Sequence, residues 1–260
     1  MKKLFLLVFA LLVLVFLPKP VSAIHSWGGY HWARTTNPFV LNWGNNVSTA
    51  WSSYLNTAAS DWSTSSVLDA NLVSGGTTSR RCRPTIGRVE VCDYSYGNNG
   101  WLGLAQIWIS GLHITQGTTK MNDSYFNTPK YNTPGWKQLV MCQETGHTFG
   151  LDHQDEIFNN PNLGTCMDYT NDPTRNDGLG NNLHPNAHDY DELGIIYSHL
   201  DTFTTVGQAI ASHTPAGIAN GDFNNASEWG KSIRNNGKVA LFERDFGGGH
   251  KLATFVVWAN

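Results

Sequence analysis

Positive charge is scarce in this chain, and charge of either sign is below the usual level. Only 14% of the 260 residues are Asp, Glu, Lys or Arg. Three of the 17 lysines and arginines lie within the first 23 residues, so the rest of the chain carries 14 basic residues against 20 acidic ones. A surface with this balance does not attract phosphates, and we therefore expect no nucleic-acid partner and no anionic membrane surface as a partner.

An apolar run long enough to span a membrane is also missing. The apolar run at residues 4–17 has 14 residues. As a helix it would be about 21 Å long, whereas the hydrocarbon core of a bilayer is about 30 Å thick. Lys2 and Lys3 precede this run and Val21-Ser22-Ala23 follows it, which is typical of a secretory signal peptide. We expect residues 1–23 to be cleaved and the mature protein to be secreted, extracellular and free of the membrane.

Cysteine is rare, and the four cysteines are an even number. They lie as two local pairs, Cys82 with Cys92 and Cys142 with Cys166, as expected for disulfides in an oxidising compartment. Four cysteines allow three pairings, and the sequence alone does not choose among them. Because all four can pair, none is left as a thiolate nucleophile, which argues against a cysteine protease.

Material for a core is abundant. The chain is 40% hydrophobic and 12% aromatic, with ten tryptophans. About 200 residues of this composition bury a substantial core in one principal domain. The many glycines and the low charge favour a loop-rich protein over one built from long charged helices. We therefore expect an α+β fold.

Hydrophobic periodicity places helices in three regions of the chain and strands between them. The expected helices cover residues 46–62, 136–149 and 186–199. The expected strands of one sheet cover residues 31–42, 67–73, 88–94, 102–109 and 114–122, and residues 81–92 are expected to form a short hairpin. The expected domain covers residues 24–200, followed by a connector at 201–226 and a small C-terminal β-hairpin extension at 227–260, with strands at 239–246 and 251–258.

One segment, residues 143–153, contains the residue types of a catalytic metal site. Gln143 and His147 are four residues apart, so a helix places both on one face, and Glu144 stands beside them, where it can polarise a metal-bound water. Gly150 tolerates a positive φ, so the chain can turn back and bring His153 to the same ion. Three protein ligands and an open fourth position are the arrangement of catalytic zinc sites.

The sequence Gly164-Thr165-Cys166-Met167-Asp168-Tyr169 then adds a methionine in a tight polar turn. Together these segments resemble the metzincin metallopeptidases, whose pattern is His-Glu-x-x-His-x-x-Gly-x-x-His followed by a Met-turn. The first ligand position holds Gln143 in place of histidine. The resemblance covers most of residues 30–200 and is matrixin-like, although Tyr169, two residues after Met167, stands where astacin- and serralysin-like metzincins have a tyrosine and matrixins have proline. It implies a twisted mixed β-sheet with two main helices and a C-terminal helix.

The resemblance also implies roles for these residues around one zinc ion. Glu144 would be the general base, His147 and His153 would be zinc ligands, and Gln143 would be a weaker third ligand. Met167 would form the floor of the site. The protein would then be a secreted, monomeric zinc-dependent endopeptidase that hydrolyses peptide bonds. Its substrate, an extended peptide or protein, would pair with an edge strand at residues 100–107.

Gln143 leaves an alternative open, because its neutral oxygen is a poorer zinc donor than imidazole. The alternative is a catalytically inactive metzincin-fold binding protein. Other side chains that would supply a further ligand are Tyr169, His113, His184 and His188. A third interpretation, a carbohydrate-binding protein, rests on the many Trp and Asn residues, although scattered tryptophans more often belong to a core.

Overall fold

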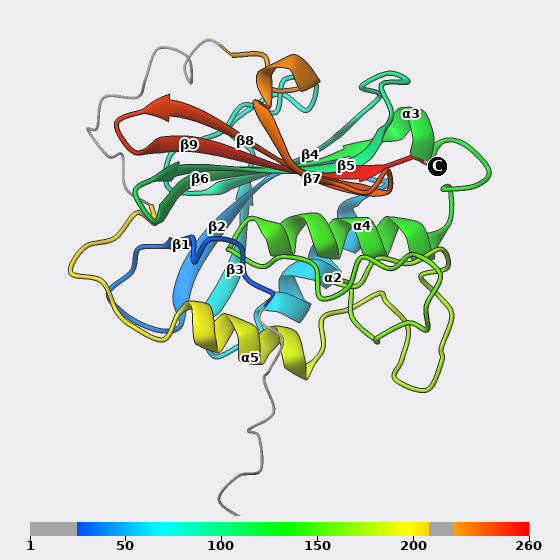
Figure 1. The fold of residues 1–260 in the computed structure, drawn as a ribbon, viewed down its shortest axis with the longest axis horizontal. Coiled ribbons are helices and arrows are strands. Elements are labelled where there is room, and N and C mark those ends of the chain that lie inside the picture. The colour runs from blue at the N-terminus through cyan, green and yellow to red at the C-terminus, as the bar shows by residue number, and fades with distance from the viewer. Residues whose placement is uncertain (1–24, 208–220, 260) are drawn as a thin grey trace, which may run out of the picture.

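The computed structural model describes residues 25–207 and 221–259. The expected signal peptide lies outside the described residues, as does the middle of the expected connector. The structure is an α+β fold in which a mixed sheet lies against α2 and α4, with α5 beyond them at the bottom of the view (Figure 1). The helices α2 and α4 also contact each other beneath the sheet.

The described residues form a nine-stranded sheet in the order β3-β2-β4-β6-β5-β9-β8-β7, with β1 paired to β6 off this path. The strands are β1 (His31–Trp32), β2 (Phe39–Asn46), β3 (Leu68–Ser74), β4 (Val89–Tyr94), β5 (Trp101–Ser110), β6 (His113–Asn122), β7 (Lys231–Asn235), β8 (Val239–Gly247) and β9 (His250–Trp258). Strands β3, β2, β4 and β6 pair in parallel, whereas β6, β5, β9, β8 and β7 pair antiparallel.

Most of the expected strands form within about one residue of the expected bounds. The first expected strand, residues 31–42, is divided into β1 and β2, and β7 was not expected from the sequence. The prediction of a hairpin at residues 81–92 is wrong. Residues 81–88 contain no strand, and β4, which follows, pairs in parallel with β2 and β6 instead.

The helices are α2 (Ser52–Trp62), α3 (Asp123–Phe126), α4 (Pro134–His147) and α5 (Ala187–Ile196), with a 3-10 turn η1 (Ala226–Glu228). Helix α2 starts later than expected, because Asn46 still belongs to β2 and Ser48 hydrogen-bonds Asp93. Helix α5 starts with a capping box between Asn186 and Asp189. In the described part of the chain, no helix has both the length and the apolarity to cross a membrane.

The tryptophans belong to the interior, as the distribution along the chain suggests. Seven of the ten are fully buried, and none of the ten is exposed. The fully buried ones are Trp32, Trp43, Trp51, Trp62, Trp101, Trp108 and Trp229. A sugar-binding surface needs exposed aromatic rings, so this observation removes the basis of the carbohydrate-binding interpretation.

The C-terminal strands do not form a separate extension. Strands β8 and β9 pair as an antiparallel hairpin, and β9 also pairs with β5 over its whole length, from Trp101↔Trp258 to Ser110↔His250. The expectation that residues 100–107 form an exposed edge of the sheet is therefore wrong, because β9 covers that edge. A pattern of alternating residues does not reveal which distant strand will be a neighbour.

Candidate metal centre

Helix α4 carries three of the four expected site residues. It starts at Pro134, and Thr133 caps it by accepting a hydrogen bond from the Trp136 backbone N–H at 3.3 Å. It ends at His147, and the chain turns at Gly150, whose φ is +104°. A Cβ at this position would lie 2.3 Å from the Tyr30 carbonyl oxygen, so the turn requires glycine.

The structure brings His147 and His153 together. Their Nε2 atoms are 3.1 Å apart, with the ring planes at 85° to each other. The Nδ1 of His147 lies 2.8 Å from the Leu151 carbonyl oxygen, and the Nδ1 of His153 lies 3.2 Å from Glu156 Oε1. A proton on each Nδ1 would satisfy these two acceptors and would leave both Nε2 atoms free to bind a cation.

Two Nε2 lone pairs that face each other at 3.1 Å would repel, and either a proton on one of them or a cation between them removes this repulsion. Burial, reinforced by the neighbouring His153 ring, lowers the pKa of His147 well below its usual value. The imidazole is therefore neutral, which is the form that binds metals. The pair has the chemistry of two zinc ligands with oriented second nitrogens.

Gln143 lies one helical turn before His147 and is fully buried. Its Nε2 donates a hydrogen bond of 2.8 Å to the Cys166 carbonyl oxygen, which fixes the orientation of the amide. Its Oε1 has no hydrogen-bond partner among the described residues. A buried amide oxygen without a partner is costly. This oxygen is therefore available to a cation.

Glu144 is fully buried beside Gln143. Neither of its carboxylate oxygens has a hydrogen-bond partner within residues 25–207 and 221–259. Burial raises the pKa of Glu144 well above its usual value. Gly103 of β5 makes room for the carboxylate, because a Cβ there would lie 2.5 Å from Glu144 Oε1. A carboxyl group kept in this setting has the properties of a general base or acid.

Met167 packs directly against α4. A Cβ on Gly146 would lie 2.7 Å from Met167 Sδ, so the helix and the methionine turn are in close contact. The pairing of the cysteines is Cys82 with Cys92 and Cys142 with Cys166, and the second disulfide joins α4 to this turn. The Met167 carbonyl oxygen in turn accepts a hydrogen bond of 2.7 Å from the Gln154 backbone N–H, next to His153.

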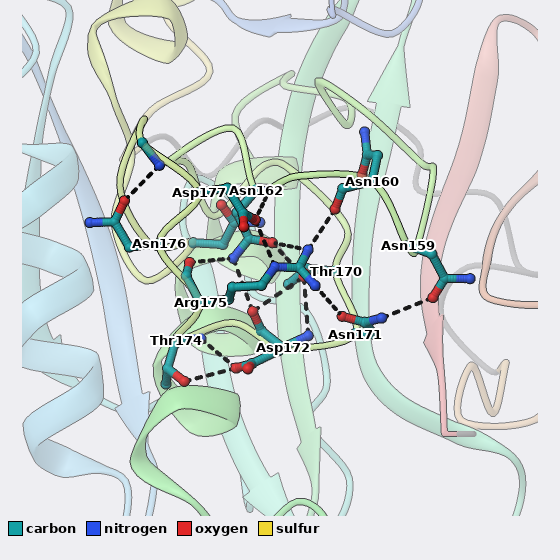
Figure 2. Close-up of polar contacts among 12 residues, drawn as sticks. Asn159, Asn160, Asn162, Thr170, Asn171, Asp172, Thr174, Arg175, Asn176 and Asp177 are labelled. Carbon is teal, nitrogen blue, oxygen red and sulfur yellow. Dashed lines mark hydrogen bonds and ion pairs between the residues drawn. The ribbon is translucent and has the colours of Figure 1, made fainter.

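The long loop between α4 and α5 is held by side chains (Figure 2). Arg175 donates from Nε to Asp177 at 2.6 Å, and from Nη1 to Asn171 at 3.0 Å. Its Nη2 donates to the Asn160 carbonyl oxygen at 2.5 Å and to Asn162 Oδ1 at 3.2 Å. This network supplies the order that helices or strands would otherwise give to the loop bearing His153 and Met167.

The other residues considered as ligands contact other side chains, although His188 Nδ1 has no hydrogen-bond partner among the described residues. His113 Nε2 lies 3.2 Å from Asp201, His184 Nδ1 lies 2.7 Å from Asp61, and the His188 ring stacks on His25. The Tyr169 ring packs against Phe158 at 5.1 Å between ring centroids.

Sequence reasoning missed the C-terminal residues that contact the centre. The Phe255 ring of β9 stacks on the His147 ring, with centroids 4.2 Å apart and planes within 7°. Arg234 of β7 binds Asp152 at 2.6 and 3.0 Å and Glu156 at 2.8 Å. Burial opposes the charge of Asp152, but the Arg234 guanidinium outweighs it and lowers the pKa of Asp152. The signal for a buried strand was the run of residues 252–257, which are all apolar except Thr254.

Comparison with known proteins gives distant structural likenesses only. No protein-family model matches the chain, and no curated protein matches it. It is similar to myroilysin with a TM-score of 0.36 and 15% identity, over 64% of this chain and 96% of that one. A second myroilysin structure gives a TM-score of 0.33 and 13% identity, over 70% and 98%.

Another similar structure is high choriolytic enzyme 1, a hatching-enzyme zinc-protease from the medaka fish Oryzias latipes. Its TM-score is 0.34 at 10% identity, over 66% of this chain and 96% of that one. Likenesses of this size assign neither a family nor an activity to the chain.

Proposed function

We propose that this protein is a secreted, metzincin-like zinc endopeptidase of matrixin type in which Gln143 replaces the first histidine ligand. The observation that carries the proposal is the pair of Nε2 atoms of His147 and His153, which face each other at 3.1 Å inside the protein. It is supported by the unpartnered oxygens of Gln143 and Glu144 on the same helix. The spacing of these residues, followed by Met167, is the metzincin pattern except at Gln143.

Each residue of the site has a separate role in the proposed hydrolysis. His147, His153 and Gln143 would hold one zinc ion, which when bound polarises a peptide carbonyl and acidifies a water molecule. Glu144 accepts the proton at its carboxylate and returns it to the leaving nitrogen. Met167 packs beneath the helix and leaves the imidazoles in place. The disulfide between Cys142 and Cys166 holds the two segments together.

The setting of the reaction is part of the same proposal. The two disulfides suit an oxidising compartment, and the acidic balance of the chain suits a protein without nucleic-acid or membrane partners. We infer a monomeric extracellular enzyme that acts on extended peptides or proteins.

A second candidate function is a binding protein that keeps the site without turnover. Two observations favour it. The ligand Gln143 is a weak zinc donor, and Glu144 is fully buried in the described structure. In this case the protein would hold an extended peptide, with or without zinc, and hydrolyse nothing.

Zinc content per chain, measured by elemental mass spectrometry on the purified protein, tests the proposal. We expect about one zinc in the wild type and in Glu144→Ala, and none in His147→Ala. The matched control is His184→Ala, which removes a histidine that pairs with Asp61, and it should retain the zinc. Equal zinc in His147→Ala and the wild type would contradict the proposed site.

Chelator-sensitive cleavage of a protein substrate then separates the two candidates. The endopeptidase predicts hydrolysis that stops on zinc removal and in Glu144→Ala. Zinc binding with no hydrolysis in any variant would favour the binding protein.

A further inference from the structure

The metal centre is closed to solvent. The side chains of Gln143, Glu144 and His147 belong to residues with 0% exposure, and His153 is 8% exposed. A peptide bond must reach Glu144 and the two imidazoles for any hydrolysis to occur. Some part of the described structure therefore occupies the space that a substrate needs.

The part that covers the centre is β9. It pairs antiparallel with β5, and its register places Phe255 opposite Ala105 and Val257 opposite Gly103. Gly103 is the residue that borders Glu144, and Phe255 is the residue that stacks on His147. Strand β9 therefore passes both the expected general base and a metal ligand.

One face of β9 is directed to the centre. Ala253, Phe255 and Val257 belong to the main core together with Leu139 and Val140 of α4. The alternate residues Leu252 and Val256 belong to small clusters apart from this core. An extended strand with apolar side chains at every second position is what fills this space.

Ion pairs of β7 hold the C-terminal strands over the centre, and β9 is joined to β7 through β8. Arg234 of β7 binds both Asp152 and Glu156. Glu156 Oε1 also lies 3.2 Å from His153 Nδ1, so the same carboxylate serves the ligand and the C-terminal strands. We call β7, β8 and β9 together, residues 231–258, the C-terminal ribbon.

We propose that β9 acts as an intramolecular blocking strand: it occupies the edge of β5 beside α4, where the resemblance places an extended substrate, and so holds the site closed. This inference rests on the proposed function, whose site it completes. A substrate would pair antiparallel with β5 and place a large apolar or aromatic side chain where Phe255 contacts His147. The described arrangement is then the closed form of the enzyme, and the C-terminal ribbon must separate from β5 before a substrate binds.

The ribbon is suited to separate as a unit. Its three strands pair with one another through β7–β8 and β8–β9, so these hydrogen bonds persist when β9 leaves β5. The side chains of Trp229, Ala240 and Val256 pack together, although Trp101 and Leu104 of β5 join that cluster. Three paired strands with an apolar face are enough for a small sheet to hold together.

Two substitutions in the full-length protein loosen the ribbon by independent means. Arg234→Ala removes the ion pairs with Asp152 and Glu156. Lys251→Pro removes a backbone N–H at the other end of β9, away from Asp152 and Glu156, together with the ion pair between Lys251 and Glu243 of β8. Arg244→Ala is the matched control, because it removes an arginine of β8 whose partner is Glu228, outside the centre.

The readouts are amide hydrogen exchange of β9 and binding of a fluorescein-labelled peptide, His-Lys-Leu-Ala-Thr-Phe-Val-Val-Trp, which copies residues 250–258. The matched peptide has Asp in place of Phe. We expect both loosened variants to exchange β9 amides at least about tenfold faster than the wild type and Arg244→Ala. They should also bind the Phe peptide at least about tenfold more tightly than the wild type does, and more tightly than the Asp peptide.

Two results would overturn the inference. Unchanged β9 exchange in both loosened variants would mean that β9 is a fixed part of the sheet. Faster exchange without tighter binding of the Phe peptide would mean that the uncovered edge is not a peptide site. The binding readout requires neither zinc nor turnover. Hydrolysis measured in the same samples therefore reports separately on the proposed function, and its absence alongside peptide binding would count only against the enzyme.

Discussion

In the proposed zinc site, the amide of Gln143 would be the weakest of the three ligands. Its Nε2 is committed to the Cys166 carbonyl oxygen, so only Oε1, which has no hydrogen-bond partner among the described residues, is left to bind a cation. An amide oxygen is a neutral, hard donor, whereas zinc prefers imidazole or thiolate. The two histidines must therefore provide most of the affinity.

Replacing this donor with imidazole should strengthen the site. We predict that Gln143→His raises zinc affinity by at least about tenfold, measured by competition with a chromogenic chelator. Gln143→Leu, which fills similar volume without a donor, should lower it. If both variants bind zinc as the wild type does, Gln143 does not face the ion.

In the proposed mechanism Glu144 has a different role from Gln143: it is not a metal ligand, but the proton transfer requires it. We predict that Glu144→Gln lowers hydrolysis by about 10²-fold or more and leaves the zinc content unchanged. The amide is neutral, so it also avoids the burial of a carboxyl group without partners. Hydrolysis and zinc content measured on the same sample would decide this, and hydrolysis near the wild-type rate would remove Glu144 from its role.

At the scale of elements, the contact between α4 and the methionine turn depends on covalent and polar links rather than on secondary structure. The Cys142–Cys166 disulfide closes a loop between residues 24 apart in sequence, and Cys166 also accepts the hydrogen bond from Gln143. Arg175 orders the rest of the same loop (Figure 2). The candidate ligands are thus positioned by links that a helix or sheet pattern does not predict.

Removing the Cys142–Cys166 disulfide tests its effect on stability and its effect on zinc binding. We predict that the double variant Cys142→Ser, Cys166→Ser loses about 3 kcal/mol of unfolding free energy and also binds zinc more weakly. Removing Cys82 and Cys92, which are 10 residues apart against 24, should cost somewhat less stability, because the loop-closure entropy grows only with the logarithm of loop length, and should leave zinc binding unchanged. Denaturant titration and chelator competition measure the two quantities. Equal zinc affinity in both double variants would contradict the positioning role.

The loop network permits a separate test. Arg175→Ala leaves Asp177, Asn171 and Asn162 without their shared donor, and we predict a loss of about 1–3 kcal/mol with faster hydrogen exchange in the loop. Arg175→Lys keeps the charge but not the planar fork, so it should recover only part of the loss. Full recovery by lysine would show that charge alone matters there.

At the scale of the whole molecule, one buried lysine links stability to pH. Lys120 of β6 is fully buried and donates hydrogen bonds to Gln106 at 2.9 Å and Asn224 at 2.8 Å. Burial lowers the pKa of Lys120 to about 7 from its ordinary value of 10.5, against the opposing charge of Asp222. Between these two values the unfolded chain holds a proton on Lys120 that the folded chain has released.

Raising the pH from about 7 toward 10 should therefore stabilise the fold. The contribution of Lys120 has an upper limit of about 1.4 kcal/mol per pH unit. We predict that unfolding free energy, measured in urea at pH 7.5 and 9.5, rises more in the wild type than in Lys120→Met. Lys137→Met, a change on the first turns of α4, should keep the wild-type slope. Equal slopes in all three proteins would contradict the assignment.

The sequence predicts the local parts of this architecture well. Periodicity and turn residues located β3, β4, β5, β6 and α4 closely, because these signals come from neighbouring residues. The spacing from Gln143 to His153 likewise predicted that the two histidines meet. The pairing of β9 with β5 was not predictable in this way, because residues such as Phe255 and Ala105 are far apart in sequence and nothing local links them.

The position of β9 within the sheet also has a consequence for the order of synthesis. The last described strand of the chain lies between β5 and β8 rather than at a margin (Figure 1). A nascent chain that has emerged only as far as α5 therefore holds every expected ligand while β5 still presents an unpaired edge. Since this pairing joins residues as distant as Trp101 and Trp258, folding can be completed only after translation has passed β9. Until then the growing polypeptide exposes a strand that invites aggregation.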